Sequence, residues 1–323
     1  MPQNHQLEFD VEARTIFKAI GGSHAYGMAT SESDIDYRGI AIPPASILHG
    51  FASEFNQAES KPDPNNPEKE DSVIYNIRKF FKLAAANNPN ILEFLWMPED
   101  CIILTTPWME KIIEQRDKFL CTRVKHAYSG YAMAQLKRIK GHRSFLLSPP
   151  KKKPERSDFG LPENQDLTIF KKQIEDLNAA GLDAMQVLGE QIQAEGAYKK
   201  AKAGWRSYQN WKANRNPKRA ELEAKWGYDT KHAAHLIRLM RQGYEMMTTG
   251  EVHVRRPDAK ELLAIRNEGI WSYDKLIGFA EEMDAKLDVY YDSGECKLPK
   301  NPDINFLNDL CQTVIEGYLI KHG

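Results

Sequence analysis

The chain has 323 residues, 41% of them hydrophobic and 28% charged, and a formal net charge of −1. These values predict a globular protein with enough residues for two domains, or for one domain with a sizeable extension. No apolar run approaches the length needed to cross a bilayer, and residues 1–6 lack the features of a secretory signal, so we expect a cytoplasmic protein outside the membrane. The chain has four cysteines that are far apart in the sequence: Cys101, Cys121, Cys296 and Cys311. This spacing indicates reduced thiols rather than a disulfide framework or a zinc site.

Basic residues are concentrated in the middle of the chain. Residues 1–120 contain 11 Lys or Arg and 18 Asp or Glu residues, residues 121–256 contain 26 and 14, and residues 257–323 contain 7 and 13. Such a basic block is typical of proteins that bind a polyanion, either a nucleic acid or a triphosphate. Solvated lysines on surface helices contribute to any such count, so charge alone leaves a nucleic-acid partner and an ordinary basic surface equally open.

The first motif follows a predicted strand at residues 15–20, whose β-branched and aromatic residues favour extended backbone. Gly21 and Gly22 then permit a turn that a side chain would resist, and we expect Ser23 to cap a short helix. Backbone N–H groups and a hydroxyl would then point at one place, which suits a phosphate. A lone Gly-Gly-Ser is more often a simple turn, so this motif needs support from its neighbours.

Two carboxylates follow in the sequence Asp34-Ile35-Asp36-Tyr37-Arg38, which we expect to form the next strand. On a strand, Asp34 and Asp36 project from the same face, where their like charges repel. A divalent cation removes this repulsion, and Mg²⁺, with Mn²⁺ as the alternative, prefers such oxygen ligands. A lone Asp-x-Asp is usually a solvated strand edge, but a phosphate cradle followed by a metal site is what two-metal phosphoryl transfer requires.

The remaining elements of the first domain alternate strands with helices. We expect a helical turn at 45–48, a loop over 56–71, a strand at 71–76 leading into a helix at 77–86, a short helix at 91–96 with Asn90 as N-cap, a strand at 101–104 and a helix at 107–116. The predicted fold class is therefore α+β, with a small mixed-sheet domain over residues 1–118.

Strand signals almost vanish after residue 118, which predicts a mainly helical domain over residues 119–323, basic in its first two thirds. We expect helices at 124–140 and 230–247, helical segments within 166–226 and three helices after residue 257. Aromatic residues alternate with lysines and arginines between residues 199 and 212. This pattern could stack bases, but it is more typical of an amphipathic helix with an aromatic core face.

A polar stripe lies on the helix predicted at 230–247. Lys231, His235 and Arg238 are four and seven positions apart and therefore share one helical face, where they could meet a single anion. The ordinary interpretation is that Arg238 pairs with a structural carboxylate and His235 lies at an interface. A zinc site at His232 and His235 is not expected, because no third ligand is near them in the sequence.

Together these motifs resemble the signature of the DNA polymerase beta-like nucleotidyltransferase superfamily. The resemblance is carried by residues 22–27 (Gly-Ser-His-Ala-Tyr-Gly) and 33–39 (Ser-Asp-Ile-Asp-Tyr-Arg-Gly), and it extends to residues 88–95 and 228–238. Within the superfamily, the chain looks most like the RNA-repair-ligase-associated nucleotidyltransferases of bacteria and phages. The expected catalytic domain is therefore residues 1–118, followed by the helical domain.

The resemblance implies that Asp34 and Asp36 bind metal together with a third carboxylate on a neighbouring strand, which helps to deprotonate the attacking hydroxyl. Asp71, at the start of a predicted strand, is the first candidate, and Glu93 is its rival. The residues expected to bind the nucleotide are Gly22, Ser23, Tyr26, Arg38, Lys231, His235 and Arg238.

The sequence thus predicts a Mg²⁺-dependent nucleotidyltransferase with a nucleoside triphosphate substrate. The acceptor implied by the resemblance and the basic middle segment is the hydroxyl of a tRNA-like RNA end, in RNA repair. Two alternatives stay open: nucleotidylation of a protein or small molecule, and a non-catalytic nucleotide- or RNA-binding module. The carboxylate pair argues against the second, because a module without metal has no need of two acids that repel each other. The sequence favours no particular base, oligomeric state or biological partner.

Overall fold

The computed structural model describes residues 9–61, 70–163 and 184–322, together with residues 172, 176 and 179. The chain divides into two compact units: unit 1 contains residues 1–138 and 230–323, and unit 2 contains residues 139–229. The domain boundary predicted at residue 118 lies within unit 1, and the helices that follow residue 229 belong to the same unit as the sheet. The α+β fold class is confirmed, since a mixed sheet is followed by a mainly helical remainder.

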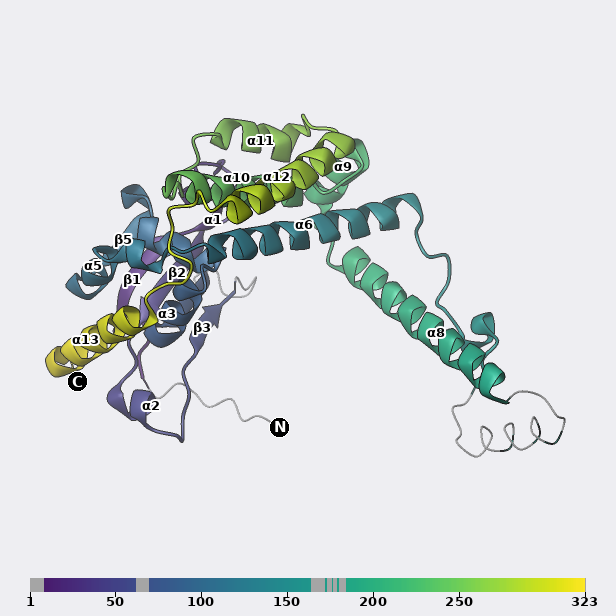
Figure 1. Ribbon diagram of the computed structural model, residues 1–323, viewed down its shortest axis with the longest axis horizontal. Helices are drawn as coiled ribbons and strands as arrows, with labels where there is room; N and C mark the ends of the chain where they lie inside the picture. Colours follow the sequence, from purple (N-terminus) through teal and green to yellow (C-terminus); the bar gives the residue numbers. More distant parts are fainter. Residues whose placement is uncertain are drawn as a thin grey trace. The chain divides into compact units, whose positions relative to one another are not determined.

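The sheet of unit 1 contains five strands in the order β3-β4-β2-β1-β5. They are β1 (Thr15–Ile20), β2 (Asp36–Ala41), β3 (Gln57–Ser60), β4 (Asp71–Asn76) and β5 (Ile102–Thr105). Figure 1 labels β1, β2, β3 and β5 of this sheet. β2 and β4 run parallel, whereas the other neighbouring pairs are antiparallel. In the parallel pair Asp36 lies opposite Asp71, so the fold brings two of the predicted metal ligands to one edge of the sheet.

One strand was not predicted. Residues 57–60, within the expected loop over 56–71, form β3 and pair antiparallel with β4, while residues 62–69 lie outside the described part of the chain. β3 is an edge strand and only its Ala58 side chain packs against the apolar cluster that contains Phe55 and Ile74. Such a strand tolerates polar residues on its solvent side, which is why its composition indicated a loop.

Aromatic packing joins the sheet to the helices that follow it. Phe17 of β1 packs against Phe94, with ring centroids 5.9 Å apart, and Phe94 stacks on Phe80 at 6.0 Å. Phe80 and Phe94 come from α3 (Ile77–Ala85) and the 3₁₀ helix η1 (Glu93–Trp96). All three rings are buried, so this cluster fixes η1, and with it Glu93, against the back of the sheet.

Asparagine side chains begin two of these helices. Asn76 accepts a hydrogen bond from the backbone N–H of Arg78 at 2.8 Å at the start of α3. Asn88 does the same for the N–H of Asn90 at 3.1 Å and is the N-cap of α4 (Pro89–Leu92). The prediction of Asn90 as the cap was therefore wrong, because Pro89 takes the first helical position, where its missing N–H costs nothing.

The other helices of unit 1 are those that were predicted, with shifted ends, together with two 3₁₀ helices that were not predicted, η2 (Glu99–Cys101) and η3 (Arg116–Phe119). The predicted ones are α1 (Gly22–Ala25), α2 (Ala45–His49), α5 (Pro107–Ile113), α10 (Thr230–Thr249), α11 (Ala259–Glu268), α12 (Tyr273–Ser293) and α13 (Ile304–His322). α6 (Arg123–Leu147) extends beyond the predicted end at 140 and contributes to both units. Among the helices that the structure describes, none combines the length and apolarity needed to span a bilayer.

Unit 2 contains the end of α6, η4 (Arg156–Phe159), α8 (Ala184–Ala213) and α9 (Pro217–Trp226). Part of the helical pattern predicted over 166–226 lies outside the described residues. The rings of Tyr208 and Trp211 on α8 lie 5.5 and 5.6 Å from that of Phe145 on α6. The aromatic residues among the lysines thus pack between helices, as the amphipathic interpretation predicts.

Candidate active site

The turn after β1 places the first motif of the site. Gly22 has a φ of 63°, a left-handed conformation that favours glycine, and it begins α1. The N-cap is Gly21, so the expectation that Ser23 caps this helix was wrong: Ser23 is its second residue. The backbone N–H of Gly21 donates to the carbonyl oxygen of Asp36 at 2.8 Å, which ties this turn directly to the start of β2.

Gly22 also allows a close approach to the Asp36 carboxylate. A Cβ atom built on Gly22 would lie 2.6 Å from Asp36 Oδ2, well inside van der Waals contact. The glycine is therefore required both by the backbone conformation and by the position of the acid.

Replacing Gly22 by Ala is expected to lower turnover about a hundredfold, because a displacement of about 1 Å in a reacting group costs that much. The same change should lower stability by only about 1 kcal/mol, the cost of an L residue in the left-handed region. Steady-state kinetics and thermal melting separate the two effects. The control is Gly130→Ala, whose Cβ would meet nothing within 4 Å. Equal turnover in both variants would contradict the proposed closeness of Gly22 to the reacting groups.

The carboxylates do not lie on one strand as predicted. β2 begins at Asp36, and Asp34 lies in the preceding loop with its neighbour Ile35 exposed. Asp34 and Asp36 nevertheless line the same cavity. The two acids are brought together by the loop geometry and not by the alternation of side chains on a strand.

The Arg38 side chain lies near Asp36 and Asp71, the first residues of the parallel strands β2 and β4. Its Nη2 is 3.6 Å from Asp36 Oδ1 and its Nη1 is 3.7 Å from Asp71 Oδ1. Both distances exceed that of a good hydrogen bond, and all three side chains are partly exposed, so water screens these pairs. Neither Arg38 nor Asp71 is among the described residues that line the cavity, although both lie beside Asp36.

A cavity of about 270 Å³ gathers most of the predicted site residues. The sheet side contributes Gly22, Ser23, Tyr26, Met28, Glu32, Ser33, Asp34 and Asp36, and the helical side contributes Lys231, Ala234, His235 and Arg238 from α10 and Arg266 from α11. The predicted stripe on α10 therefore faces the carboxylates across one cavity. Sequence analysis missed Arg266, because no motif or periodic pattern in α11 distinguishes it from a surface arginine.

Arg238 is a buried cation, with only 2% of its surface exposed. Its Nη1 donates to Gln242 Oε1 at 2.7 Å, and its guanidinium lies 3.7 Å from the centre of the Tyr26 ring. The nearest structural carboxylate, Glu93, stands off at 3.9 Å from Nη1. Nη2 has no hydrogen-bond partner within the described part of the chain, which leaves one side of a buried cation unsatisfied.

His235 is the second cavity residue with an unsatisfied atom, since its buried Nε2 lacks a hydrogen-bond partner among the described residues. Burial, followed by the charge of Arg238, lowers the pKa of His235 to about 3. The imidazole is therefore neutral at physiological pH. In the predicted stripe, His235 thus offers a hydrogen bond and not a positive charge.

Glu93 lies behind the cavity and not in it. The hydroxyl of Tyr26 donates to Glu93 Oε1 at 3.1 Å, and Glu93 itself is 7% exposed. The described residues that line the cavity include Tyr26 but not Glu93. Of the two candidates for a third carboxylate, only Asp71 lies beside Asp36.

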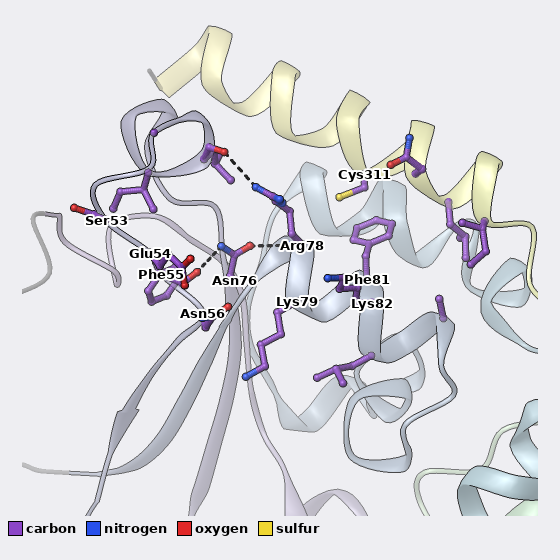
Figure 2. A pocket seen from close by; sticks show the side chains of 18 residues that line it. Ser53, Glu54, Phe55, Asn56, Asn76, Arg78, Lys79, Phe81, Lys82 and Cys311 are labelled. Carbon is purple, nitrogen blue, oxygen red and sulfur yellow. Dashed lines mark hydrogen bonds between the residues drawn. The ribbon is translucent and has the colours of Figure 1, made fainter. Parts of the chain in front are cut away.

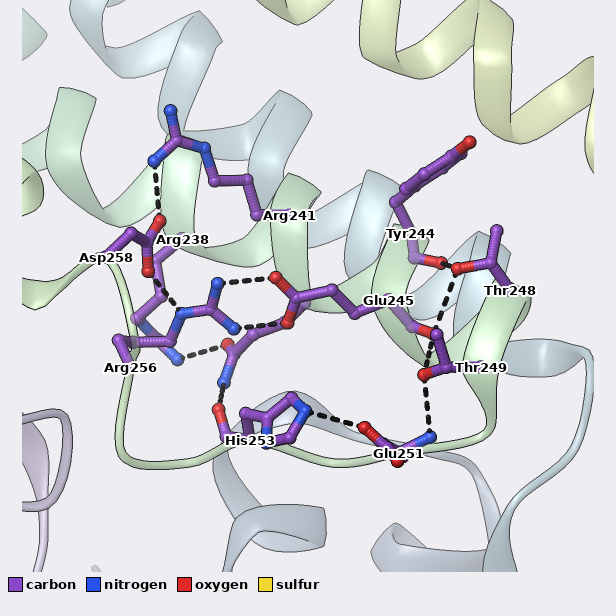
Figure 3. A network of polar contacts seen from close by, with 11 residues as sticks. Arg238, Arg241, Tyr244, Glu245, Thr248, Thr249, Glu251, His253, Arg256 and Asp258 are labelled. Carbon is purple, nitrogen blue, oxygen red and sulfur yellow. Dashed lines mark hydrogen bonds and ion pairs between the residues drawn. The ribbon is translucent and has the colours of Figure 1, made fainter.

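A network of ion pairs joins α10 to the segment that follows it, residues 251–258 (Figure 3). Arg256, 4% exposed, donates to both carboxylate oxygens of Glu245 and to Asp258, which also binds Arg241. The backbone N–H of Arg256 donates to the carbonyl oxygen of Tyr26 at 3.1 Å. Because Arg256 links α10 to the residue under Arg238, the two walls of the cavity are held in a defined relation.

A second cavity, of about 870 Å³, contains none of the predicted site residues (Figure 2). It is lined by α2, α3, the segment before β3 and α13. Two of its polar side chains make hydrogen bonds to backbone carbonyls. Asn76 Nδ2 donates to the carbonyl oxygen of Phe55 at 2.7 Å, and Arg78 donates to that of Leu48 at 3.2 Å. Of these two cavities, only the smaller one is lined by predicted site residues.

Comparison with known proteins shows what the first part of the chain resembles. A relative in enterobacteria phage T4, an uncharacterized 38.9 kDa protein of the nrdC-mobD intergenic region, is 36% identical over 140 residues, which cover 40% of this chain and 40% of the phage protein. The match thus spans less than half the length of that relative. No solved structure matches the chain. Residues 3–148, which contain the glycine turn and the three acids, match the sequence model of the RNA repair pathway DNA polymerase beta family.

Proposed function

We propose that this protein is a metal-dependent nucleotidyltransferase. An acceptor hydroxyl would attack the α-phosphate of a nucleoside triphosphate, the bond from that phosphorus to the bridging oxygen would break, and pyrophosphate would leave. The observation that carries the proposal is the cavity in which Asp34 and Asp36 face Ser23, Lys231 and Arg238. Acids that can hold a metal and cations that can hold phosphates meet there, on a chain whose first part matches the model of a DNA polymerase beta family.

The carboxylates fit a divalent metal. Asp34, Asp36 and Asp71 present only oxygen donors, the set that Mg²⁺ or Mn²⁺ prefers, and Asp36 and Asp71 sit side by side on parallel strands. These residues would hold the metal. When bound, it would supply charge neutralisation for the phosphates and make the acceptor hydroxyl more acidic.

The other cavity residues would bind and orient the triphosphate. The Ser23 hydroxyl and the unsatisfied Nη2 of Arg238 would donate to phosphate oxygens, with Lys231 adding positive charge from the same face of α10. Neutral His235 would donate or accept a single hydrogen bond without adding charge. Tyr26 would contribute mainly by supporting Arg238 through its ring.

An RNA end is the acceptor that we favour. The family's description refers to an RNA repair pathway, and unit 2 contains 17 Lys or Arg residues against 12 Asp or Glu residues. An excess of positive charge favours a polyanionic acceptor over a typical protein surface. A protein or small-molecule acceptor is the second candidate, since the cavity itself does not distinguish acceptor hydroxyls.

The deciding experiment is one incubation. Purified protein is mixed with each of the four α-³²P-labelled ribonucleoside triphosphates and Mg²⁺ or Mn²⁺, with either total tRNA or a protein extract treated with ribonuclease. Label in RNA supports the RNA acceptor, whereas label only in protein supports the alternative. No metal-dependent release of pyrophosphate with any acceptor would overturn the proposed activity.

RNA binding, if it uses unit 2, should weaken steeply with salt. Replacing the exposed Lys151, Lys152 and Lys153 by Gln is expected to reduce the slope of log K against log[salt] by about 2, because each phosphate contact contributes about 0.7–0.9. Fluorescence anisotropy with labelled tRNA between low and physiological salt measures this slope. The matched control is the triple change of exposed Lys260, Lys297 and Lys300 to Gln, in unit 1. An identical slope in both triple variants would exclude the 151–153 segment from the RNA contact.

A further inference from the structure

Arg238 stands between two possible negative partners. On one side its Nη1 is held by Gln242 and approaches Glu93 Oε2 at 3.9 Å. On the other side its Nη2 has no hydrogen-bond partner among the described residues, and Arg238 lines the cavity. A triphosphate in the cavity would therefore compete with Glu93 for the charge of Arg238.

Glu93 is held in place from several directions. Tyr26 donates a hydrogen bond to its Oε1, and the Tyr26 ring also lies under the Arg238 guanidinium, so one side chain sets the position of both ion-pair partners. The titratable and charged groups that act on Glu93 from the neighbouring elements are Tyr26, Arg38, Tyr75, Tyr128 and Arg238. Gln242 is fixed in turn, since its Nε2 donates to the carbonyl oxygen of His253 at 3.0 Å.

We propose that Glu93 is a positioning residue, which orients Arg238 toward the triphosphate and takes up a proton from solvent when the triphosphate binds. The inference rests on the proposed nucleotide site. No covalent bond forms or breaks in this step: the proton moves from water or buffer to a Glu93 carboxylate oxygen, and the triphosphate replaces Glu93 as the anion that neutralises Arg238.

The direction of the proton transfer follows from charge. Burial raises the pKa of Glu93 to about 7, against the opposing effects of Arg238 and of the Tyr26 hydrogen bond. A bound triphosphate adds negative charge near the carboxylate and draws Arg238 toward itself, and both effects raise this pKa further. With a free-state pKa near 7 and a higher one in the complex, binding at pH 7 should take up about half a proton.

The pH dependence of affinity has a defined sign. Because the complex holds more protons than the free protein, binding is favoured at low pH and affinity falls as the pH rises through 7. The loss is at most about tenfold per pH unit for a single group. Below about pH 5.5 Glu93 is protonated in both states, so proton uptake should disappear there.

The experiment is calorimetric titration of the full chain with a non-hydrolysable ATP analogue and saturating Mg²⁺. At pH 7, heats are measured in two buffers with different enthalpies of ionisation, and the titration is repeated at pH 5.5. The wild-type protein should take up about half a proton per site at pH 7 and much less at pH 5.5. Glu93→Gln, which mimics the protonated carboxyl, should bind the analogue with no uptake by this group.

Two further variants make the test specific. Tyr26→Phe removes a hydrogen bond that favours the ionised carboxylate, so the greatest proton uptake should move to a pH above that of the wild type. Glu110→Gln, at an exposed position on α5, is the matched control and should behave as the wild type does.

The outcomes separate the two proposals. Buffer-independent heats in the wild type at pH 7, or uptake that persists unchanged in Glu93→Gln, overturn the role of Glu93 while the nucleotide site stands. If the wild type binds none of the corresponding analogues of the four ribonucleoside triphosphates at any pH, the nucleotide site is overturned, and the role of Glu93 with it. Melting temperatures of all variants establish that each is folded before titration.

Discussion

Asp36→Asn should reduce nucleotidyl transfer about a thousandfold or more, because a lost metal ligand removes several kcal/mol of transition-state stabilisation. Asp36 is the carboxylate that contacts the most parts of the site. It lines the cavity, lies opposite Asp71 in the parallel strand pair and lies against Gly22. Its removal should leave the fold intact, since its ion pair with Arg38 is long and partly exposed. Asp34→Asn is expected to give a loss of the same order.

Pyrophosphate release, measured with the acceptor found by labelling, tests this expectation alongside thermal melting. The melting temperature should stay close to that of the wild type or rise slightly, because neutralising one acid relieves its repulsion of Asp34. Asp117→Asn, at an exposed position in η3, is the matched control and should retain full activity. Turnover near the wild-type value in Asp36→Asn with Mg²⁺ would show that the active site lies elsewhere.

Arg238→Met should weaken binding of the triphosphate by about 2–3 kcal/mol, or about 30- to 150-fold, the value of a hydrogen bond between a buried cation and an anion. The structural reason is the unsatisfied Nη2 at the cavity. The loss of stability should be small for the removal of a buried ion. Arg238 lowers the pKa of Glu93, so without Arg238 the Glu93 carboxyl becomes protonated at neutral pH and leaves no unpaired buried charge.

Titration of the ATP analogue into Arg238→Met and into the exposed-site control Arg206→Met gives the comparison. A lower affinity in the first variant alone, with a similar melting temperature, assigns Arg238 to ligand binding. A large drop in melting temperature with unchanged affinity would instead make Arg238 part of the scaffold that connects α10 to α1.

The sequence by itself determined the elements whose signals are local. The β-branched residues of β1 and β4, the glycine turn at 21–22 and the proline at the start of α5 each constrain only a few neighbouring residues, and the predicted elements appear there. Local signals failed where a tertiary contact decided the outcome. β3 is a strand because β4 supplies a partner for its backbone, and Asp34 is in a loop although its spacing from Asp36 suits a strand.

Only the tertiary structure decided which distant residues share the site. α10 follows Asp36 by almost two hundred residues, and no sequence pattern requires that it face the acids, yet Lys231, His235 and Arg238 line the same cavity. Burial, which depends on long-range packing, also set the chemistry of individual groups. Burial keeps His235 neutral, although the sequence of the polar stripe suggests a positive charge there. The fold also places Glu93 behind Arg238, whereas the sequence analysis considered Glu93 as a metal ligand.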